Sequence, residues 1–147
     1  MTTDTLPFDF NSVPYTWALC FNDTCPMHDT CMRHFAARHM PPDRAQGPAV
    51  YPAALQKGKC RLFVEKRVIR SAWGFSKLFL DVKRVDDTPI RREIQRYLGC
   101  RSTYYRYMSG RFTLTPEQQA DILEIFRTYG YTAPRDFDNY VEHYVYE

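Results

Sequence analysis

The side chains with the most specific chemistry in this chain of 147 residues are four of its cysteines. Cys20, Cys25 and Cys31 lie within twelve positions, and Cys60 follows after a long segment rich in proline and glycine. In a reducing compartment, clustered thiols stay reduced and often bind metal. Four thiolates complete the tetrahedral shell of a zinc ion and leave no position for water. The spacing therefore predicts one structural zinc site formed by Cys20, Cys25, Cys31 and Cys60.

Three other interpretations of these cysteines stay open. Three close cysteines and a distant one, with a proline directly after the second, also suit an iron–sulfur cluster. His28 or His34 would replace Cys60 as the fourth zinc ligand in a mixed site. In the absence of metal, the cysteines would be small buried apolar side chains.

Basic side chains gather in the middle of the chain. Residues 57–111 hold fifteen Lys and Arg against five Asp and Glu, a local charge of about +10. By the same count, residues 1–56 carry about −2 and residues 112–147 about −5, so the whole-chain charge of +3 hides a basic centre. A basic stretch between acidic flanks attracts the phosphates of nucleic acid. We therefore expect DNA as a partner.

The most informative stretch within this basic segment is residues 98–110. Gly99 would end one short helix, and Ser102 or Thr103 would begin the next. Two short helices joined by a tight turn form a helix-turn-helix, whose second helix lies in the major groove of DNA. Arginine on that helix takes guanine edges, and free N–H groups at its start bind phosphate. Cys100, in the turn, is predicted to be a small core residue.

This stretch resembles the second and third helices of phage-repressor-type helix-turn-helix domains, through the pattern Leu98-Gly99-x-x-Ser102-Thr103-Tyr104-x-Arg106-Tyr107-x-x-Gly110. The segment 114–126 is similar to the fourth helix of those domains. The resemblance implies that Tyr104 packs inward and that its neighbours face the DNA. The side chains expected to read bases are Arg101, Ser102, Thr103, Tyr105 and Arg106. The side chains expected to hold phosphates are Lys83, Arg84, Arg91, Arg92 and Arg111.

Local patterns around these sites predict the elements that position them. A helix over residues 31–38 would follow a cap at Asp29 or Thr30, and residues 59–69 have the pattern of a strand. Residues 78–85 fit one face of a helix, and Thr88-Pro89 would start another, with the threonine as N-cap. A capping box at residues 115–118 would start the last helix, which Gly130 would close.

These elements predict a mostly α fold, with a minor α+β character, divided into three parts. Residues 1–60 form a cysteine-rich, metal-binding module with a Pro/Gly loop, and residues 61–130 form a helical, helix-turn-helix-like domain. Residues 131–147 form an acidic, aromatic tail that packs on that domain.

The whole chain also resembles an uncharacterised family of small cysteine-rich proteins from gut anaerobes. Three stretches carry this resemblance, at residues 17–26, 73–79 and 104–119. They read Trp-x-x-Cys-Phe-Asn-Asp-x-Cys-Pro, Trp-Gly-Phe-Ser-Lys-Leu-Phe and Tyr-Tyr-Arg-Tyr followed by Leu-Thr-Pro-Glu-Gln-Gln. The family has no assigned activity, so this resemblance implies fold boundaries and no chemistry.

Several classes of protein are not expected from the sequence. The chain has no run of eighteen apolar residues for a membrane span and no secretory pattern at its start, so a cytoplasmic location is expected. It contains no phosphate loop, nucleophile elbow, zinc-protease helix or dinucleotide fingerprint, and its four histidines have no evident acid or nucleophile partner. The pair Asp86-Asp87 is better explained as helix punctuation than as a metal-binding carboxylate pair. We therefore do not expect an enzyme.

Two functions from different classes remain. The first is a small DNA-binding protein with a structural metal site, acting as a transcriptional regulator or as an accessory factor of a mobile element. The alternative is a module for protein–protein interaction, because tyrosine and arginine dominate the energetic centres of such interfaces. In that case the tail of residues 131–147 would cover the helix at residues 101–108, so the exposure of Arg101, Tyr105 and Arg106 distinguishes the two functions.

Overall fold

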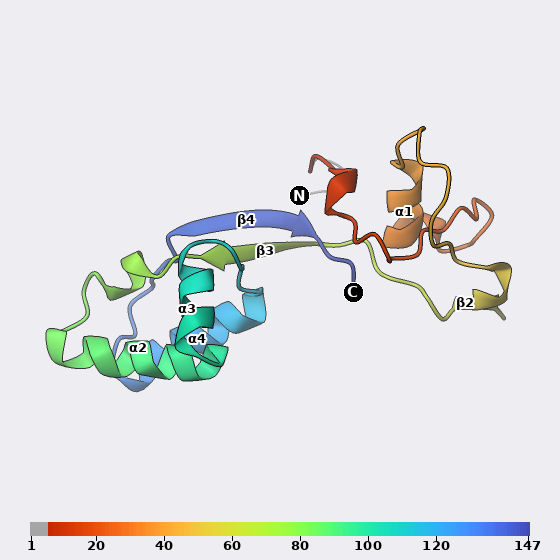
Figure 1. Ribbon diagram of the computed structural model, residues 1–147. Helices are drawn as coiled ribbons and strands as arrows, with labels where there is room; N and C mark the ends of the chain where they lie inside the picture. The colour runs from red at the N-terminus through yellow and green to blue at the C-terminus, as the bar shows by residue number, and fades with distance from the viewer. Residues whose placement is uncertain (1–5) are drawn as a thin grey trace. The chain divides into compact units, whose positions relative to one another are not determined.

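The computed structural model describes residues 6–147, which form two compact units (Figure 1). The first, which we call the cysteine unit, runs to Val68 and includes Tyr144–Glu147. The second, which we call the helical unit, comprises Ile69–His143. The predicted boundary after residue 60 therefore moves to residue 68, because the segment after the last clustered cysteine still packs in the first unit. Among the described residues, no helix is long and apolar enough to cross a membrane.

The cysteine unit is built from short elements. Three of them are 3-10 helices, at Phe10–Ser12, His28–Thr30 and Pro52–Ala54. The helix α1 (Met32–Arg38) and a hairpin of β1 (Leu55–Gln56) and β2 (Lys59–Cys60) complete the unit. Its apolar clusters are small. One is centred on Leu19 and Ala36, and the other on Met32, Val64 and Tyr144. Both clusters hold fewer buried residues than the core of the helical unit.

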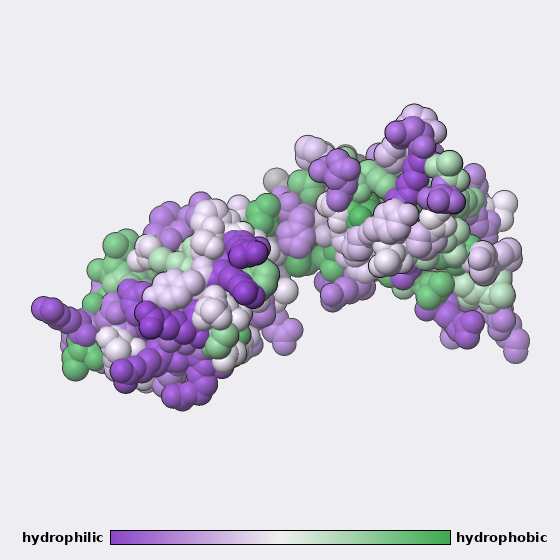
Figure 2. Space-filling view, viewed as in Figure 1, coloured by the Kyte–Doolittle hydropathy of each residue, from purple (hydrophilic) through white to green (hydrophobic). Residues whose placement is uncertain are grey.

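The helical unit contains α2 (Arg84–Leu98), α3 (Arg101–Met108) and α4 (Pro116–Thr128). The strand β3 (Val68–Trp73) leads into it from the cysteine unit and pairs with β4 (Asn139–Tyr144). α2 packs against both α3 and α4 (Figure 1). Hydrophilic side chains cover much of the outer surface over α2 and α3 (Figure 2). The buried core of this unit is Ala72, Phe75, Leu78, Phe79, Ile90, Ile94, Tyr104, Leu114, Ile122, Phe126 and Phe137.

The start of α4 is the element that the sequence predicts best. The Thr115 hydroxyl accepts a hydrogen bond from the backbone N–H of Gln118, and the Gln118 side chain accepts one from the N–H of Thr115. This reciprocal capping box is confirmed, and Pro116 occupies the first helical position, where no N–H is needed. Ile122 and Phe126, one turn apart, then point into the core.

The predicted start of α2 at Pro89 is wrong. The helix begins five residues earlier, at Arg84, and contains Pro89 in its interior. The Tyr131 hydroxyl accepts a hydrogen bond from the backbone N–H of Lys83 and donates one to the Asp86 carboxylate at 2.6 Å, which fixes the first turn from outside the helix. Asp86 and Asp87 also lie in that turn, where negative charge is favourable. These tertiary contacts outweigh the single backbone hydrogen bond that proline removes.

The predicted helix over residues 78–85 is also absent from the described structure, which has a 3-10 helix at Ser76–Phe79 instead. Leu78 and Phe79 are still buried in the core. The apolar pattern therefore predicted the burial of these side chains correctly and the type of helix incorrectly.

The fold class is mixed α+β rather than mostly α. The described residues contain four α-helices and two small two-stranded antiparallel sheets. The predicted single tail of residues 131–147 is divided. Phe137 lies in the core of the helical unit, Asn139–Tyr144 forms β4, and the last four residues belong to the cysteine unit. The strand β4 has no regular alternation of buried and exposed side chains, because only Tyr144 of its six residues is buried.

Candidate metal centre and nucleic-acid interface

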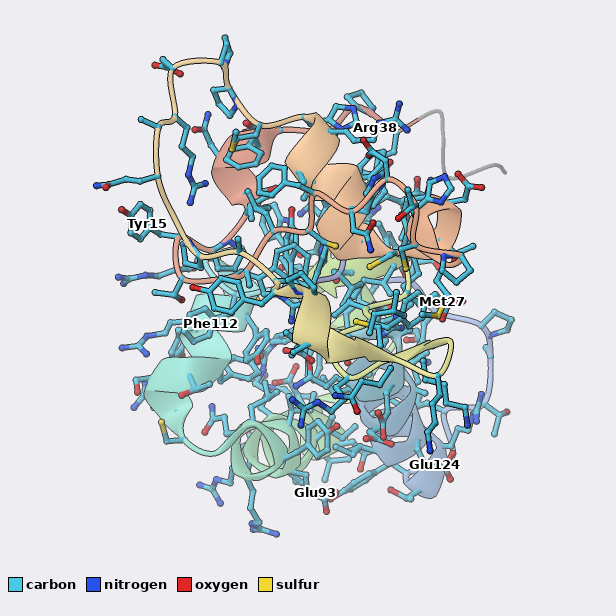
Figure 3. All side chains as sticks on the ribbon, turned by 90° about the vertical axis from the view of Figure 1, so that its right-hand side faces the viewer. Tyr15, Met27, Arg38, Glu93, Phe112 and Glu124 are labelled. Carbon is cyan, nitrogen blue, oxygen red and sulfur yellow. The ribbon has the colours of Figure 1, made fainter. Side chains whose placement is uncertain are left out.

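The four clustered cysteines line one small cavity in the cysteine unit. Cys20, Cys25, Cys31 and Cys60 all border an enclosed space of about 20 Å³. A cavity of that size holds one water-sized sphere, and therefore one ion. Figure 3 shows sulfur atoms gathered beside the labelled Met27, which borders the same cavity. The cysteines chosen from their spacing are thus brought to one place.

Backbone contacts hold the segments that carry these cysteines. The N–H of Cys20 donates to the carbonyl of Arg33 on α1 at 3.2 Å, which joins the first cysteine to the helix after the third. Cys31 forms an isolated β-bridge with Glu65, and Cys60 pairs with Leu55 across the β1–β2 hairpin. Three of the four cysteines therefore come from segments that backbone pairing ties to their neighbours.

Arg33 connects the segments next to two of the cysteines, a role that the sequence did not predict. Its guanidinium donates to the carbonyls of Leu62 at 2.6 Å and Ala18 at 2.8 Å, the residues two positions from Cys60 and Cys20. Burial lowers the pKa of Arg33, and the nearby cysteines partly oppose that shift. A positive charge held here would offset part of the net negative charge of a zinc ion with four thiolates. The sequence carries no signal for it, because an arginine two positions after Cys31 has no fixed partner before the chain folds.

The clustered cysteines affect the pKa of one another. Burial raises the pKa of Cys20, and so do the neighbouring Cys31, Cys25 and Cys60, although a backbone hydrogen bond at Asn22 opposes them. The thiols are therefore close enough to repel one another as thiolates, and a divalent ion removes that repulsion. Within residues 6–147, no three Cys, His, Asp or Glu side chains are already set in ligand positions around a common point.

The histidines have partners that the sequence did not reveal, which corrects that prediction. His34 is buried, with its Nε2 atom 2.8 Å from the Asp23 carboxylate. The Nδ1 atom of His28 lies 2.7 Å from the carbonyl of Cys25. In the helical unit, the Nε2 atom of His143 lies 2.7 Å from the Ser71 hydroxyl. Ser71 is only 1% exposed, so a substrate cannot reach this serine–histidine pair.

The helix α3 presents the predicted face to solvent. Tyr104 is buried in the core at 1% exposure, whereas Arg101, Ser102 and Arg106 are exposed. Tyr105 is 50% exposed, and Thr103 is half-buried. The inward orientation expected for Tyr104 is confirmed. Two residues, Gly99 and Cys100, separate α2 from α3, so the two helices have the tight connection that the motif requires.

The far end of α3 is fixed against β3. The backbone N–H of Gly74 donates to the carbonyl of Tyr107 at 3.1 Å. Gly110 has a φ of +85°, and a Cβ atom there would lie 2.8 Å from the Trp73 ring. Only glycine fits such a left-handed position pressed against an indole ring. The helix therefore has a fixed orientation on the rest of its unit.

Arg91, predicted to hold phosphate, is instead used inside the fold. Its guanidinium contacts the Asp87 carboxylate at 2.6 Å and the Tyr104 hydroxyl at 3.2 Å, and it covers the ring of Phe79. Asp87 raises the pKa of Arg91, which stays fully charged. Arg91 thus connects α2 to the buried tyrosine of α3. The other phosphate candidates, Lys83, Arg84, Arg92 and Arg111, are exposed.

Cys100 is exposed rather than a core residue, which corrects the prediction for the turn. The reason is that the Gly99 turn ends α2 and leaves position 100 as the N-cap of α3, outside the helix. The hydroxyls of Ser102 at 3.1 Å and Thr103 at 3.2 Å contact its sulfur. These hydrogen bonds lower the pKa of Cys100 to about 7.

We predict that the alkylation rate of Cys100 is half-maximal at about pH 7. The thiolate is the nucleophile, and the pKa at which it forms is lowered from the ordinary value of 9.0 to about 7. The rate should rise with pH through that midpoint and level off about one to two pH units above it. Iodoacetamide labelling followed by peptide mass spectrometry measures it. The Ser102→Ala/Thr103→Ala variant should move the midpoint toward 9. An unchanged midpoint in that variant would contradict the proposed cause.

The profile of one family matches residues 1–146, and that family is described as "Family of unknown function (DUF6078)". No curated protein and no solved structure matches the chain significantly.

Proposed function

We propose that this chain, which belongs to the family of unknown function DUF6078, is a small DNA-binding protein without enzymatic activity. In this proposal α3 enters the major groove, and one structural zinc ion holds the cysteine unit together. The protein would act as a transcriptional regulator or as an accessory factor of a mobile element.

One observation carries the proposal. The exposed side chains of α3 are those of Arg101, Ser102, Tyr105 and Arg106, while Tyr104 is locked into the core behind them. Such a helix offers hydrogen-bond donors and a ring to a partner and keeps a fixed orientation. Arginine recognises guanine through two hydrogen bonds to its major-groove edge. The exposed Lys83, Arg84, Arg92 and Arg111 are near enough in sequence to bind the flanking phosphates.

The alternative, a protein-interaction module, predicted that the C-terminal residues would cover α3. Arg101, Tyr105 and Arg106 are instead exposed, and β4 pairs with β3. This difference favours the DNA-binding proposal. An exposed tyrosine beside two arginines would also suit a protein interface. The binding experiment must therefore distinguish a chain that binds DNA from one that binds only a partner protein.

The zinc ion in this proposal has a structural role. With four thiolate ligands no coordination position remains for a substrate or water, so the ion would stabilise the fold and catalyse nothing.

A fluorescence-anisotropy titration of the full chain with random-sequence duplex DNA tests the proposal. We expect a dissociation constant below about 100 µM at low salt, the weak limit of non-specific binding. Four phosphate contacts should give a slope of about −4 in the logarithm of the association constant against the logarithm of salt concentration. Absence of binding at 100 µM, or binding independent of salt, would contradict DNA binding and favour the protein-interaction alternative.

A further inference from the structure

The basic segment of the sequence is divided between the two units, and one part of it is not used by the helix-turn-helix. Lys57, Lys59 and Arg61 belong to the cysteine unit and are all exposed. They lie on the β1–β2 hairpin, whose register pairs Gln56 with Lys59. Lys57 has a φ of 53°, and the next residue, Gly58, has a φ of 76°. This two-residue turn carries Lys57, Lys59 begins β2, and Arg61 comes directly after β2.

An open cavity of about 420 Å³ adjoins this hairpin. Its walls are mostly apolar and come from Phe21, Val50, Tyr51, Pro52 and Leu55, and the cysteine cluster borders it through Cys20, Cys25 and Cys60. Its volume is in the range of small-ligand sites. Two of its rings are unusually exposed, Tyr51 at 77% and Phe21 at 53%. Large rings at the edge of a cavity give a flat molecule a surface on which to stack.

Asn22 lines the same cavity and carries an amide side chain. Its Oδ1 atom accepts hydrogen bonds from the backbone N–H and the hydroxyl of Thr24, at 3.1 and 2.7 Å. These bonds fix the amide so that its NH₂ group points away from Thr24. Within the described part of the chain, that NH₂ group has no hydrogen-bond acceptor. It can therefore donate to the acceptor edge of a bound ligand.

We propose that this cavity binds an unpaired base of a single-stranded nucleic acid. The base stacks on Tyr51 or Phe21 and accepts a hydrogen bond from Asn22, and the adjoining phosphates contact Lys57, Lys59 and Arg61. Stacking on aromatic side chains beside a positively charged track is how proteins bind single strands. A base in a duplex cannot take this place, because its faces are covered by its neighbours. An apolar peptide would leave the three cations without partners, so charge complementarity selects a polyanion.

This site goes beyond the proposed duplex binding and uses a different unit of the protein. Every residue named for it lies between positions 20 and 61, whereas α3 lies in the helical unit. The two proposals can therefore fail separately.

The test is an anisotropy titration of the zinc-loaded full chain with labelled single strands of twelve thymidines or twelve uridines. Tyr51→Ala should weaken single-strand binding by about tenfold and leave duplex binding unchanged, because base stacking is lost. Tyr15→Ala is the matched control, since Tyr15 is also 72% exposed in the same unit but does not line the cavity. Lys57→Ala/Lys59→Ala should remove two phosphate contacts. The slope of the logarithm of the association constant against the logarithm of salt concentration should then become about 1.4 less steep.

Several outcomes would overturn the inference, three of them in the titrations above. They are no single-strand binding at 100 µM, equal losses in Tyr51→Ala and Tyr15→Ala, or displacement of the oligonucleotide by an equal concentration of an oligoglutamate peptide. If instead Arg101→Ala/Arg106→Ala abolishes single-strand binding while Tyr51→Ala does not, α3 is the site and the inference is wrong. Duplex binding that fails while Tyr51-dependent single-strand binding persists would remove the proposed function and leave this site standing.

Discussion

Replacing Cys60 with serine is expected to release zinc and unfold the cysteine unit, while the helical unit stays folded. The reason is the balance between a small core and a strong ligand. The apolar clusters of the cysteine unit are small, whereas a structural zinc ion contributes about 10–16 kcal/mol in apparent binding free energy at neutral pH. That contribution is as large as the whole stability of a typical domain. Cys60 is only half-buried, so loss of its packing alone cannot produce such an effect.

Two-dimensional amide NMR with elemental analysis measures this result. Signals from the cysteine unit should collapse in Cys60→Ser, and the bound zinc should fall from one per chain to near zero. Cys100→Ser is the matched control, because the same atom is replaced at an exposed position in the other unit. It should keep the zinc and every signal outside its neighbourhood. A Cys60→Ser variant that remains as folded as Cys100→Ser would contradict the claim that the four cysteines bind one ion. A brown wild-type protein that contains iron would identify an iron–sulfur cluster instead.

Replacing both Arg101 and Arg106 with alanine is expected to reduce duplex affinity by at least about 30-fold. Each arginine that takes a guanine edge contributes about 1–3 kcal/mol, and the two sit on the exposed face of α3. Tyr104 remains in the core of the variant, so α3 keeps its place. The loss should be larger for a duplex rich in G·C pairs than for one rich in A·T pairs, because adenine and thymine lack the paired acceptors of guanine.

The control is Arg96→Ala/Arg127→Ala, which removes the same charge from two exposed helical positions of the same unit outside α3. At physiological salt, charges away from the contact surface are screened, so this variant should lose only a few-fold in affinity. Thermal unfolding of both variants shows whether the fold is kept. Equal losses in the two pairs would mean that binding follows net charge alone and that α3 reads no bases.

The parts of the fold that the sequence predicts well are those set by local contacts. The capping box at Thr115 needs only residues three positions apart, and the structure has it. Glycine after α2 and after α3 marks positions of positive φ, at 111° and 85°, which other residues avoid. The inward position of Tyr104, implied by the resemblance to repressor-type domains, is also present. In each case, the physical cause lies within one or two turns of the chain.

The parts that could not be predicted depend on residues distant in sequence. The start of α2 is set by Tyr131, which is 45 positions from Asp86. Arg91 bonds to Asp87 and to Tyr104 of another helix, and the contact with Tyr104 appears only once the helices are packed. Pairing of β3 with β4 joins segments about 70 residues apart, and neither has strict alternation of buried and exposed positions.

The candidate metal site lies between these two extremes. Clustering identified the four cysteines, and the structure brings all four to one cavity. The support around them was invisible in the sequence, because Arg33 bonds to carbonyls, which every residue carries. Cys100 was assigned to the core from its apolar character alone, yet its position before α3 places it in solvent.

Amide chemical-shift mapping of the zinc-loaded full chain, titrated with duplex DNA at low salt, tests the central claim that α3 is the DNA-reading surface. The predicted result is that the largest shifts fall on residues 101–106, with smaller shifts at Lys83, Arg84, Arg92 and Arg111. Residues 117–127 of α4 should not respond, since that helix carries three acidic side chains against one arginine. Saturating duplex that leaves residues 101–106 unshifted, or that shifts only residues outside α2 and α3, would contradict the claim.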